Sequence, residues 1–399
     1  MKFNMHGKNA AVLAEGAYRV AAAKASTSDN VKRDADLFAQ RAQAFDADQA
    51  EEAGLVEDVT VTPMEAVVGQ SGGFVKETAG FGVLLERNGG QKGEYILAMR
   101  GTVGPEGRSK DWFSNYQIGL TRGPTGSLVH SGFMDIYRSM QVDVQRMIKE
   151  ARPQRIHFIG HSLGGALATL AAIDYARNGT ATSHLYTFGA PRVGSHGLAS
   201  DVEKLIGVER LKRVYSISDP VPMIPLVPFC HVGPGSIGFA DSKPISGDAH
   251  SMLGNYIPQM PATGWPPEMR MSTKSDPGYW LTQAESHMGF GSGIGYFLLA
   301  KALKGILYLA ANSISAALTV GFTVADALMT AIRSGLAIAK KIEGYMLRFV
   351  KAALKFAGVA VAATTVTAAD LTVSFLRWIL DMVMRPIRVA VSAAIRTVT

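Results

Sequence analysis

One pentapeptide in this sequence combines residue types and spacing that can do covalent chemistry. Gly160-His161-Ser162-Leu163-Gly164 fits the pattern G-x-S-x-G, with a strand-like run at 156–159 before it and an Ala- and Leu-rich, helix-like run at 163–177 after it. A strand, tight turn and helix can hold a serine hydroxyl on a strained turn, where glycines let backbones pass closely. The Leu163 N–H then faces the oxyanion of a tetrahedral intermediate. The pattern predicts a nucleophilic Ser162, and the alternative is an ordinary glycine-rich turn.

The segments around this turn alternate between strand and helix patterns. Residues 81–86 and 95–99 are short β-type runs, and Asn88-Gly89-Gly90 between them indicates a hairpin. Residues 155–159, 184–188 and 211–217 are further β-type runs. Strands separated by helices favour a mostly parallel sheet covered on both faces. The expected fold class is therefore α/β.

Several other motifs occur on either side of the serine in a fixed order. They are Met99-Arg100-Gly101-Thr102, V-H-S-G-F at 129–133, Leu163-Gly164-Gly165-Ala166, T-F-G-A-P-R-V-G at 187–194, and D-P-V-P at 219–222 followed by F-C-H-V-G at 229–233. In this order they resemble the class 3 lipases, the fungal-lipase-like branch of the α/β-hydrolases, over roughly residues 80–260. The resemblance implies an α/β-hydrolase fold and ester hydrolysis by a Ser–Asp–His triad.

The chain order of that triad directs the search for the acid. Asp219 ends a β-type run and opens a Pro-rich loop, where a carboxylate can orient an imidazole. Its alternative role is that of a turn-forming Asp before Pro. Asp241 and Asp248 are the other candidates for the acid.

Three histidines follow Asp219 and compete for the role of the base. His231 occupies the family's H-x-G position, which the resemblance marks as structural. His250 begins a segment, 250–256, that is similar to the family's His-to-Tyr ending, and a loop there can reach over the sheet edge. His287 is the alternative. The predicted catalytic residues are Ser162, Asp219 and His250.

The resemblance also implies an oxyanion hole and a lid. Thr102 joins Leu163 in the oxyanion hole through its backbone N–H and its hydroxyl, while Arg100 braces the turn. Residues 103–116 occupy the lid position, where Trp112 either faces acyl chains or packs in the core of a static loop.

Composition limits the classes of protein to consider. Hydrophobic residues make up 47% of the 399 residues and charged residues 18%, which favours a globular or membrane-associating protein over a disordered one. Residues 290–399 hold 12 Lys and Arg against 4 Asp and Glu, so the net charge of +7 comes entirely from this tail. Basic residues between long apolar stretches suit an anionic membrane surface, and no nucleic acid is expected as a partner.

The chain has a single cysteine, which excludes an intrachain disulfide. No cofactor or metal is expected.

Three regions are expected along the chain. Residues 1–60 form a helical lead-in, 61–289 the catalytic α/β-hydrolase domain, and 290–399 a hydrophobic, basic helical region. Residues 305–325 carry no charge, a length that can cross a ~30 Å hydrocarbon core, and 356–376 are interrupted only by Asp370. The tail can therefore span a bilayer, lie on its surface, or pack as a helical hairpin on the catalytic domain.

These patterns support two classes of function. The first is a lipase or phospholipase. The absence of an apolar signal-peptide core before Ser26 predicts synthesis in the cytoplasm, followed either by action inside the cell or by export through a non-Sec route. This combination resembles bacterial type VI secretion lipase effectors, which implies membrane association at the target and a cognate immunity or accessory protein. The second is a membrane-inserting or pore-forming toxin on an inert hydrolase scaffold. An enzyme for neutral glycerides or small esters is a third possibility.

Overall fold

The computed structural model describes residues 5–18, 60–71, 77–88, 92–102, 119–225, 229–233, 236–239, 245–267, 276–286, 293–313, 324–359 and 366–397. Its centre is a seven-stranded sheet in the order β1-β2-β3-β6-β7-β8-β9. The strands are β1 (Thr60–Ser71), β2 (Glu77–Asn88), β3 (Glu94–Met99), β6 (Arg155–His161), β7 (Thr182–Phe188), β8 (Leu211–Ser216) and β9 (Ser236–Phe239). The pairs β1–β2 and β2–β3 are antiparallel, and all later pairs are parallel. A two-stranded sheet of β4 (Leu120–Arg122) and β5 (Leu128–His130) lies apart from it.

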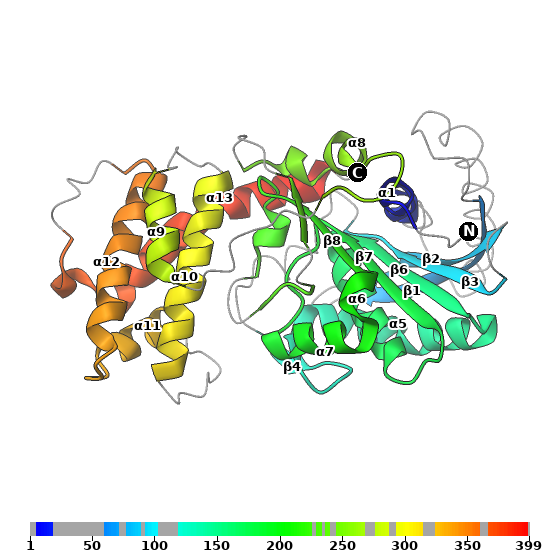
Figure 1. Ribbon diagram of the computed structural model, residues 1–399, viewed down its shortest axis with the longest axis horizontal. Coiled ribbons are helices and arrows are strands. Elements are labelled where there is room, and N and C mark those ends of the chain that lie inside the picture. The colour runs from blue at the N-terminus through cyan, green and yellow to red at the C-terminus, as the bar shows by residue number, and fades with distance from the viewer. Residues whose placement is uncertain are drawn as a thin grey trace.

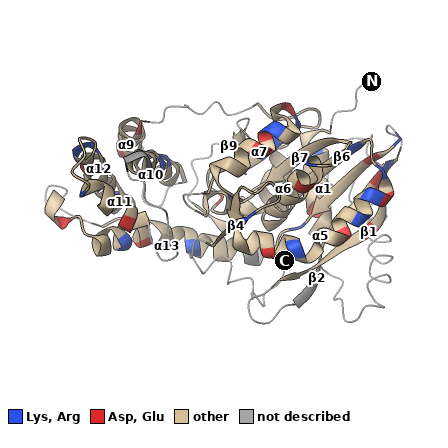
Figure 2. Ribbon diagram, turned by 90° about the horizontal axis from the view of Figure 1, so that it is seen from below, with Lys and Arg blue, Asp and Glu red and all other residues tan. Residues whose placement is uncertain are grey.

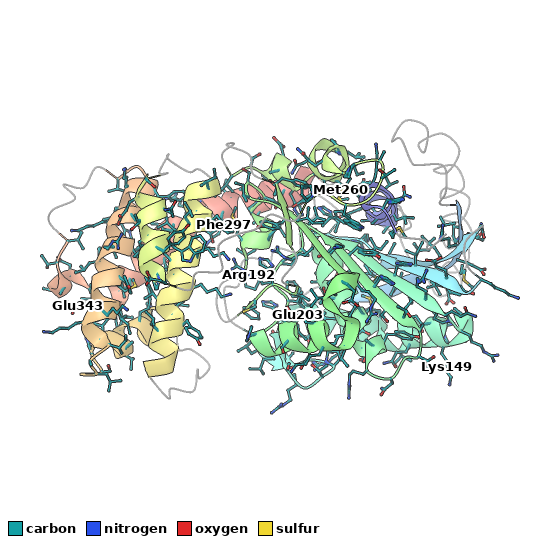
Figure 3. All side chains as sticks on the ribbon, in the orientation of Figure 1. Lys149, Arg192, Glu203, Met260, Phe297 and Glu343 are labelled. Atoms are coloured by element: carbon teal, nitrogen blue, oxygen red, sulfur yellow. The ribbon has the colours of Figure 1, made fainter. Side chains whose placement is uncertain are left out.

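Helices cover both faces of the large sheet (Figure 1). On one face, α5 (Ser131–Ala151), α6 (Leu163–Ala176) and α7 (His196–Ile206) enclose a core with Leu97, Phe158 and Leu185. On the other, α1 (Gly7–Gly16) and the segment from Met252 to Met260 enclose a second core with Ile96 and Ile159. Figure 3 labels Met260 beside α1.

Strands β3 and β6 are buried along nearly their whole length because helices pack on both faces of the sheet. All six residues of β3 are buried, and so are six of the seven in β6. A strand packed on both faces has no solvent side, which is why its sequence is a continuous apolar run without alternation. The expected α/β-hydrolase fold, with a mostly parallel central sheet, is confirmed.

The C-terminal region is a group of helices beside the sheet domain (Figure 1). They are α9 (Pro277–Ser286), α10 (Gly293–Ser313), α11 (Val324–Ile332), α12 (Ala339–Phe356) and α13 (Val373–Thr397). Their apolar faces form a third core, which we call the bundle core. It also takes in Val221, Met223 and Ile224 from the loop after β8, so sheet domain and helices share buried surface.

The structure describes only parts of the two apolar runs of the tail. In the run 356–376, α12 ends at Phe356, and a short 3₁₀ turn, Ala368–Asp370, precedes α13. In the other run α10 ends at Ser313, and residues 314–323 lie outside the described residues. None of the helices in the described part of the chain combines the length and apolar character needed to cross a bilayer.

The structure describes only part of residues 1–60, the predicted helical lead-in. Helix α1, within this lead-in, buries Ala10, Val12 and Leu13. Residues 19–59 of the lead-in lie outside the described residues. The domain limits at 60 and 289 stay predictions.

Candidate active site

Ser162 lies on a strained turn between β6 and α6. Its φ of 56° and ψ of −131° put it in a region that L-residues rarely adopt, at a typical cost of about 1–3 kcal/mol. Glycines make the turn possible. A Cβ on Gly160 would lie 2.2 Å from the carbonyl oxygen of Gly164, and a Cβ on Gly164 would lie 2.2 Å from that of Met99. The backbone therefore forces the serine to protrude at the carboxyl end of β6.

Asp219 is a fully buried carboxylate held by three donors. Its Oδ2 accepts a hydrogen bond from the Tyr256 hydroxyl at 2.5 Å and lies 2.8 Å from His250 Nδ1. Its Oδ1 accepts from the Val221 N–H at 2.9 Å. A buried charge is tolerated when hydrogen bonds replace its water. Burial and the neighbouring Asp219 raise the pKa of Tyr256 well above its ordinary value, so the phenol stays a donor.

His250 ends a short 3₁₀ turn, Gly247–His250, and is 1% exposed. With Nδ1 directed at Asp219, its other ring nitrogen, Nε2, is buried and makes no hydrogen bond within the described part of the chain. An imidazole oriented by a carboxylate through Nδ1 presents Nε2 as the nitrogen that takes a proton. The ring packs against that of His161, the residue before Ser162, with centroids 4.4 Å apart.

Gly189 connects the serine to the other two residues. The Ser162 N–H donates to the carbonyl of Phe188 at 3.0 Å. A Cβ on the next residue, Gly189, would lie 2.7 Å from Asp219 Oδ2 and 3.0 Å from His250 Nδ1. The structure thus places Asp219 and His250 in direct contact beside Gly189, the residue that follows the hydrogen-bond partner of the Ser162 N–H.

A second hydrogen-bonded chain reaches the site through His161. The Tyr18 hydroxyl lies 2.7 Å from His161 Nδ1, and His161 Nε2 lies 2.9 Å from the backbone oxygen of His250. Burial, with a smaller contribution from His250, lowers the pKa of His161 well below its ordinary value. A neutral ring suits both contacts, since Nδ1 accepts from the phenol while Nε2–H donates to the carbonyl.

The predicted oxyanion donors lie next to the serine. Leu163 is the first residue of α6, where an N–H has no partner within the helix. Thr102 follows Gly101, and a Cβ on Gly101 would lie 2.7 Å from the Ser162 Cβ. The Thr102 hydroxyl is buried without a hydrogen-bond partner among the described residues. Arg100 braces this turn from behind, donating to the carbonyls of Gly80 and Gly101.

Of the alternative residues, the structure describes His231 and Asp248, and neither takes part in this arrangement. His231 lines a small cavity with Lys212 and Arg213, and burial and the charges of Arg213 and Arg192 lower its pKa well below the ordinary value. Figure 3 labels Arg192 on the side of the sheet domain that faces α10. Asp248 is exposed. Asp241, His287 and the predicted lid at 103–116 lie outside the described residues.

Part of the sequence that builds this site is similar to known proteins. Residues 96–229 match the family model for lipase (class 3). This segment of the chain therefore resembles a class 3 lipase. Secreted mono- and diacylglycerol lipase 1 of Fusarium solani is 30% identical over 183 residues, which cover 44% of this chain and 53% of that protein. Phospholipase A1-II 2 of Oryza sativa subsp. indica is 29% identical over 179 residues, covering 35% and 43%. A solved lipase from Rhizopus microsporus var. chinensis has a TM-score of 0.37 at 21% identity, covering 55% and 77%.

The alignment with the Fusarium relative covers only part of each protein. The chain spans about half the length of the Fusarium relative, and the aligned part is less than half of this chain. The segment that matches the class 3 lipase model contains Ser162 and Asp219 but stops before His250. The assignment of the base therefore depends on the hydrogen bond to Asp219.

Two contacts of this candidate site have no clear signal in the sequence. Tyr256 marks the end of a family-like segment, yet nothing in its spacing indicates that its hydroxyl bonds Asp219. Tyr18 lies 143 residues before His161. Tyr18, two residues after the end of α1, thus reaches the residue before Ser162. No metal-binding group of three or more His, Cys, Asp or Glu occurs in the part of the chain that the structure describes.

Proposed function

We propose that this protein hydrolyses carboxylic ester bonds of lipids with Ser162 as nucleophile, His250 as base and Asp219 as the acid that orients it. The observation that carries the proposal is the buried Asp219–His250 pair, 2.8 Å apart, beside a serine held at positive φ. A buried pair and a strained nucleophile are both costly to maintain, and together they fit the requirements of acyl transfer.

Each residue has a defined step in this proposal. Ser162 Oγ attacks the ester carbonyl while His250 Nε2 takes its proton, and Asp219 stabilises the imidazolium. The Leu163 and Thr102 N–H groups and the Thr102 hydroxyl stabilise the oxyanion, a contribution of about 2.7–4 kcal/mol for each donor. The tetrahedral intermediate expels the alcohol, which takes the proton from His250. Water then attacks the acyl-enzyme by the same path and releases the fatty acid.

Membrane phospholipid is the substrate class that we propose. The phospholipase A1 relative supports it, and so does the charge of the tail. Figure 2 shows Lys and Arg recurring along α13. On this helix Trp378 is half exposed and stacks on Phe375 at 5.8 Å, and Val389 is exposed. An aromatic pair among cationic residues suits the interface of an anionic bilayer, where each basic residue contributes ~1 kcal/mol.

The test compares the wild type with Ser162→Ala on vesicles of defined phospholipids, with products resolved by mass spectrometry. We expect the variant to lose hydrolysis by about 10⁶-fold and to keep its unfolding temperature and its binding to anionic vesicles. Ser286→Ala, an exposed hydroxyl on α9, is the matched control and should hydrolyse like the wild type. Retained hydrolysis by Ser162→Ala would end the proposal.

Vesicles of non-hydrolysable ether lipids separate the enzyme from the pore-forming alternative. An enzyme leaves them intact, whereas a pore releases a trapped dye. Mono- and diacylglycerols in the same assay decide between phospholipid and the neutral glycerides named for the Fusarium relative. Delivery as an antibacterial effector, with a cognate immunity protein, stays a prediction.

A further inference from the structure

The loop that carries Asp219 is anchored in the helical C-terminal region. Val221, whose N–H bonds the Asp219 carboxylate, is fully buried, and its side chain belongs to the bundle core. Met223 and Ile224, which follow it, pack in the same core. The backbone donor that holds the acid is therefore positioned by side chains of α9 to α13 as well as by the sheet.

The loop that carries His250 is in contact with the end of α13. A Cβ on Gly247, three residues before His250, would lie 2.7 Å from the backbone nitrogen of Ala394 and 3.0 Å from the Cβ of Ala393. Ala394 is fully buried. Gly247 has no side chain, so the helix backbone rests directly on the first turn of the 3₁₀ segment Gly247–His250.

The two loops are also bonded to each other. The Ser246 N–H donates to the carbonyl of Ser218, the residue before Asp219, at 3.2 Å. Ile245 packs against the bundle core. A displacement of α13 is thus transmitted to both members of the Asp219–His250 pair.

Helix α13 has the length to connect the two regions. Its 25 residues extend about 37 Å, and in Figure 1 it runs from the other C-terminal helices to the sheet domain. Along this path Leu376, Ile379 and Ile387 are fully buried in the bundle core. Loop residues have no ladder of backbone hydrogen bonds, so packing of this kind decides where they lie.

We propose that the end of α13, at Ala393 and Ala394, is a positioning element for the Asp219–His250 pair, and that the helical C-terminal region is part of the catalytic apparatus. This inference rests on the proposed function. His250 Nε2 must meet the Ser162 hydroxyl within hydrogen-bond distance, and a misplacement of 1 Å can cost about 10²-fold in rate.

Gly247→Ala tests the contact directly, because the added methyl group meets the backbone of α13. We expect kcat on a soluble short-chain ester to fall by about 10- to 100-fold, with KM changed less than about two-fold. As His250 moves away from Asp219, the acid limb of the pH profile should shift to lower pH. Rates are expressed per active site, titrated with a fluorophosphonate that reacts with an activated serine.

Gly254→Ala is the matched control. It makes the same change in the turn after His250, where a Cβ would meet only Ser251, at 3.2 Å, and should leave kcat unchanged. A second variant, Ala393→Val, approaches the contact from the helix and should lower kcat in the same way. Its control, Ser392→Val, lies on the exposed side of the same turn.

The outcomes separate this inference from the proposed function. Wild-type kcat per titrated site and a wild-type pH profile in both Gly247→Ala and Ala393→Val would overturn the positioning role, even if both variants unfold at lower temperature. A wild type that neither hydrolyses esters nor reacts with the fluorophosphonate at Ser162 would overturn the proposed function itself.

Discussion

The nucleophile and its two partners are held by different means. Ser162 is fixed by its own neighbourhood, since Gly160 and Gly164 pass too close to other backbones for any side chain, and β6 and α6 lead directly into and out of the turn. Asp219 and His250 lie on loops without long elements of their own, and they depend on the bundle core and on each other. One half of the site is local in sequence, and the other is assembled from distant segments.

This difference means that a substitution in the turn and a substitution in the loops should fail in different ways. A side chain added in the turn has no room, so the fold itself should suffer. A change of charge in the loops leaves the packing intact, so chemistry should suffer while stability is kept. Three measurements follow from this contrast.

Asp219→Asn should have the largest effect. The amide keeps the size of the carboxylate but no longer stabilises an imidazolium, so kcat should fall by about 10⁴-fold with a small change in unfolding temperature. Asp248→Asn, an exposed change in the 3₁₀ turn that ends at His250, is the control and should keep full activity. If Asp248→Asn lost activity and Asp219→Asn kept it, Asp248 and not Asp219 would be the acid that orients His250.

Gly160→Ala should damage the fold rather than the chemistry. The methyl group would lie 2.2 Å from the carbonyl oxygen of Gly164 and 2.7 Å from the backbone nitrogen of Gly165, and we expect a loss of about 3 kcal/mol or more in the free energy of unfolding. Urea denaturation measures it. A variant as stable as the wild type would contradict the view that close backbone contact fixes the turn.

His130→Phe should change how stability depends on pH. Burial lowers the pKa of His130 to about 4, so the native state holds it neutral while the unfolded chain takes up a proton below pH 6.5. Stability is therefore lost as the pH falls from about 6.5 to about 4, by roughly 1.4 kcal/mol per pH unit for this residue. Urea midpoints across this range should show a shallower loss in the variant. An unchanged slope would count against a neutral, buried His130.

The C-terminal region supplies a control for that measurement. Residues 290–399 contain no histidine, whereas His157, His161 and His184 in the sheet domain also have lowered pKa values because they are buried. As the pH falls, the free energy of unfolding of the sheet domain should therefore decrease before that of the C-terminal helices. Fluorescence of Trp265 in the sheet domain, compared with that of Trp280 on α9, can follow the two regions separately.

The sequence by itself determined what is local. The G-x-S-x-G turn with its flanking strand and helix predicts Ser162 and the Leu163 N–H, because backbones that pass too closely for any side chain leave a pattern of glycines over a few residues. Buried parallel strands likewise leave continuous apolar runs, from which the sheet was expected. The order of the family-like motifs pointed to Asp219, and it left His250 and His287 open.

Only the tertiary structure decided what depends on distant segments. Asp219 accepts a hydrogen bond from His250, and the hydroxyls of Tyr256 and Tyr18 reach the site from positions that no spacing rule indicates. The tail shows the same limit, since a charge-free run has one composition whether it crosses a bilayer or packs against other helices. Burial against a partner, and not hydropathy, places Leu376 and Ile387 in a core shared with the loop of Asp219.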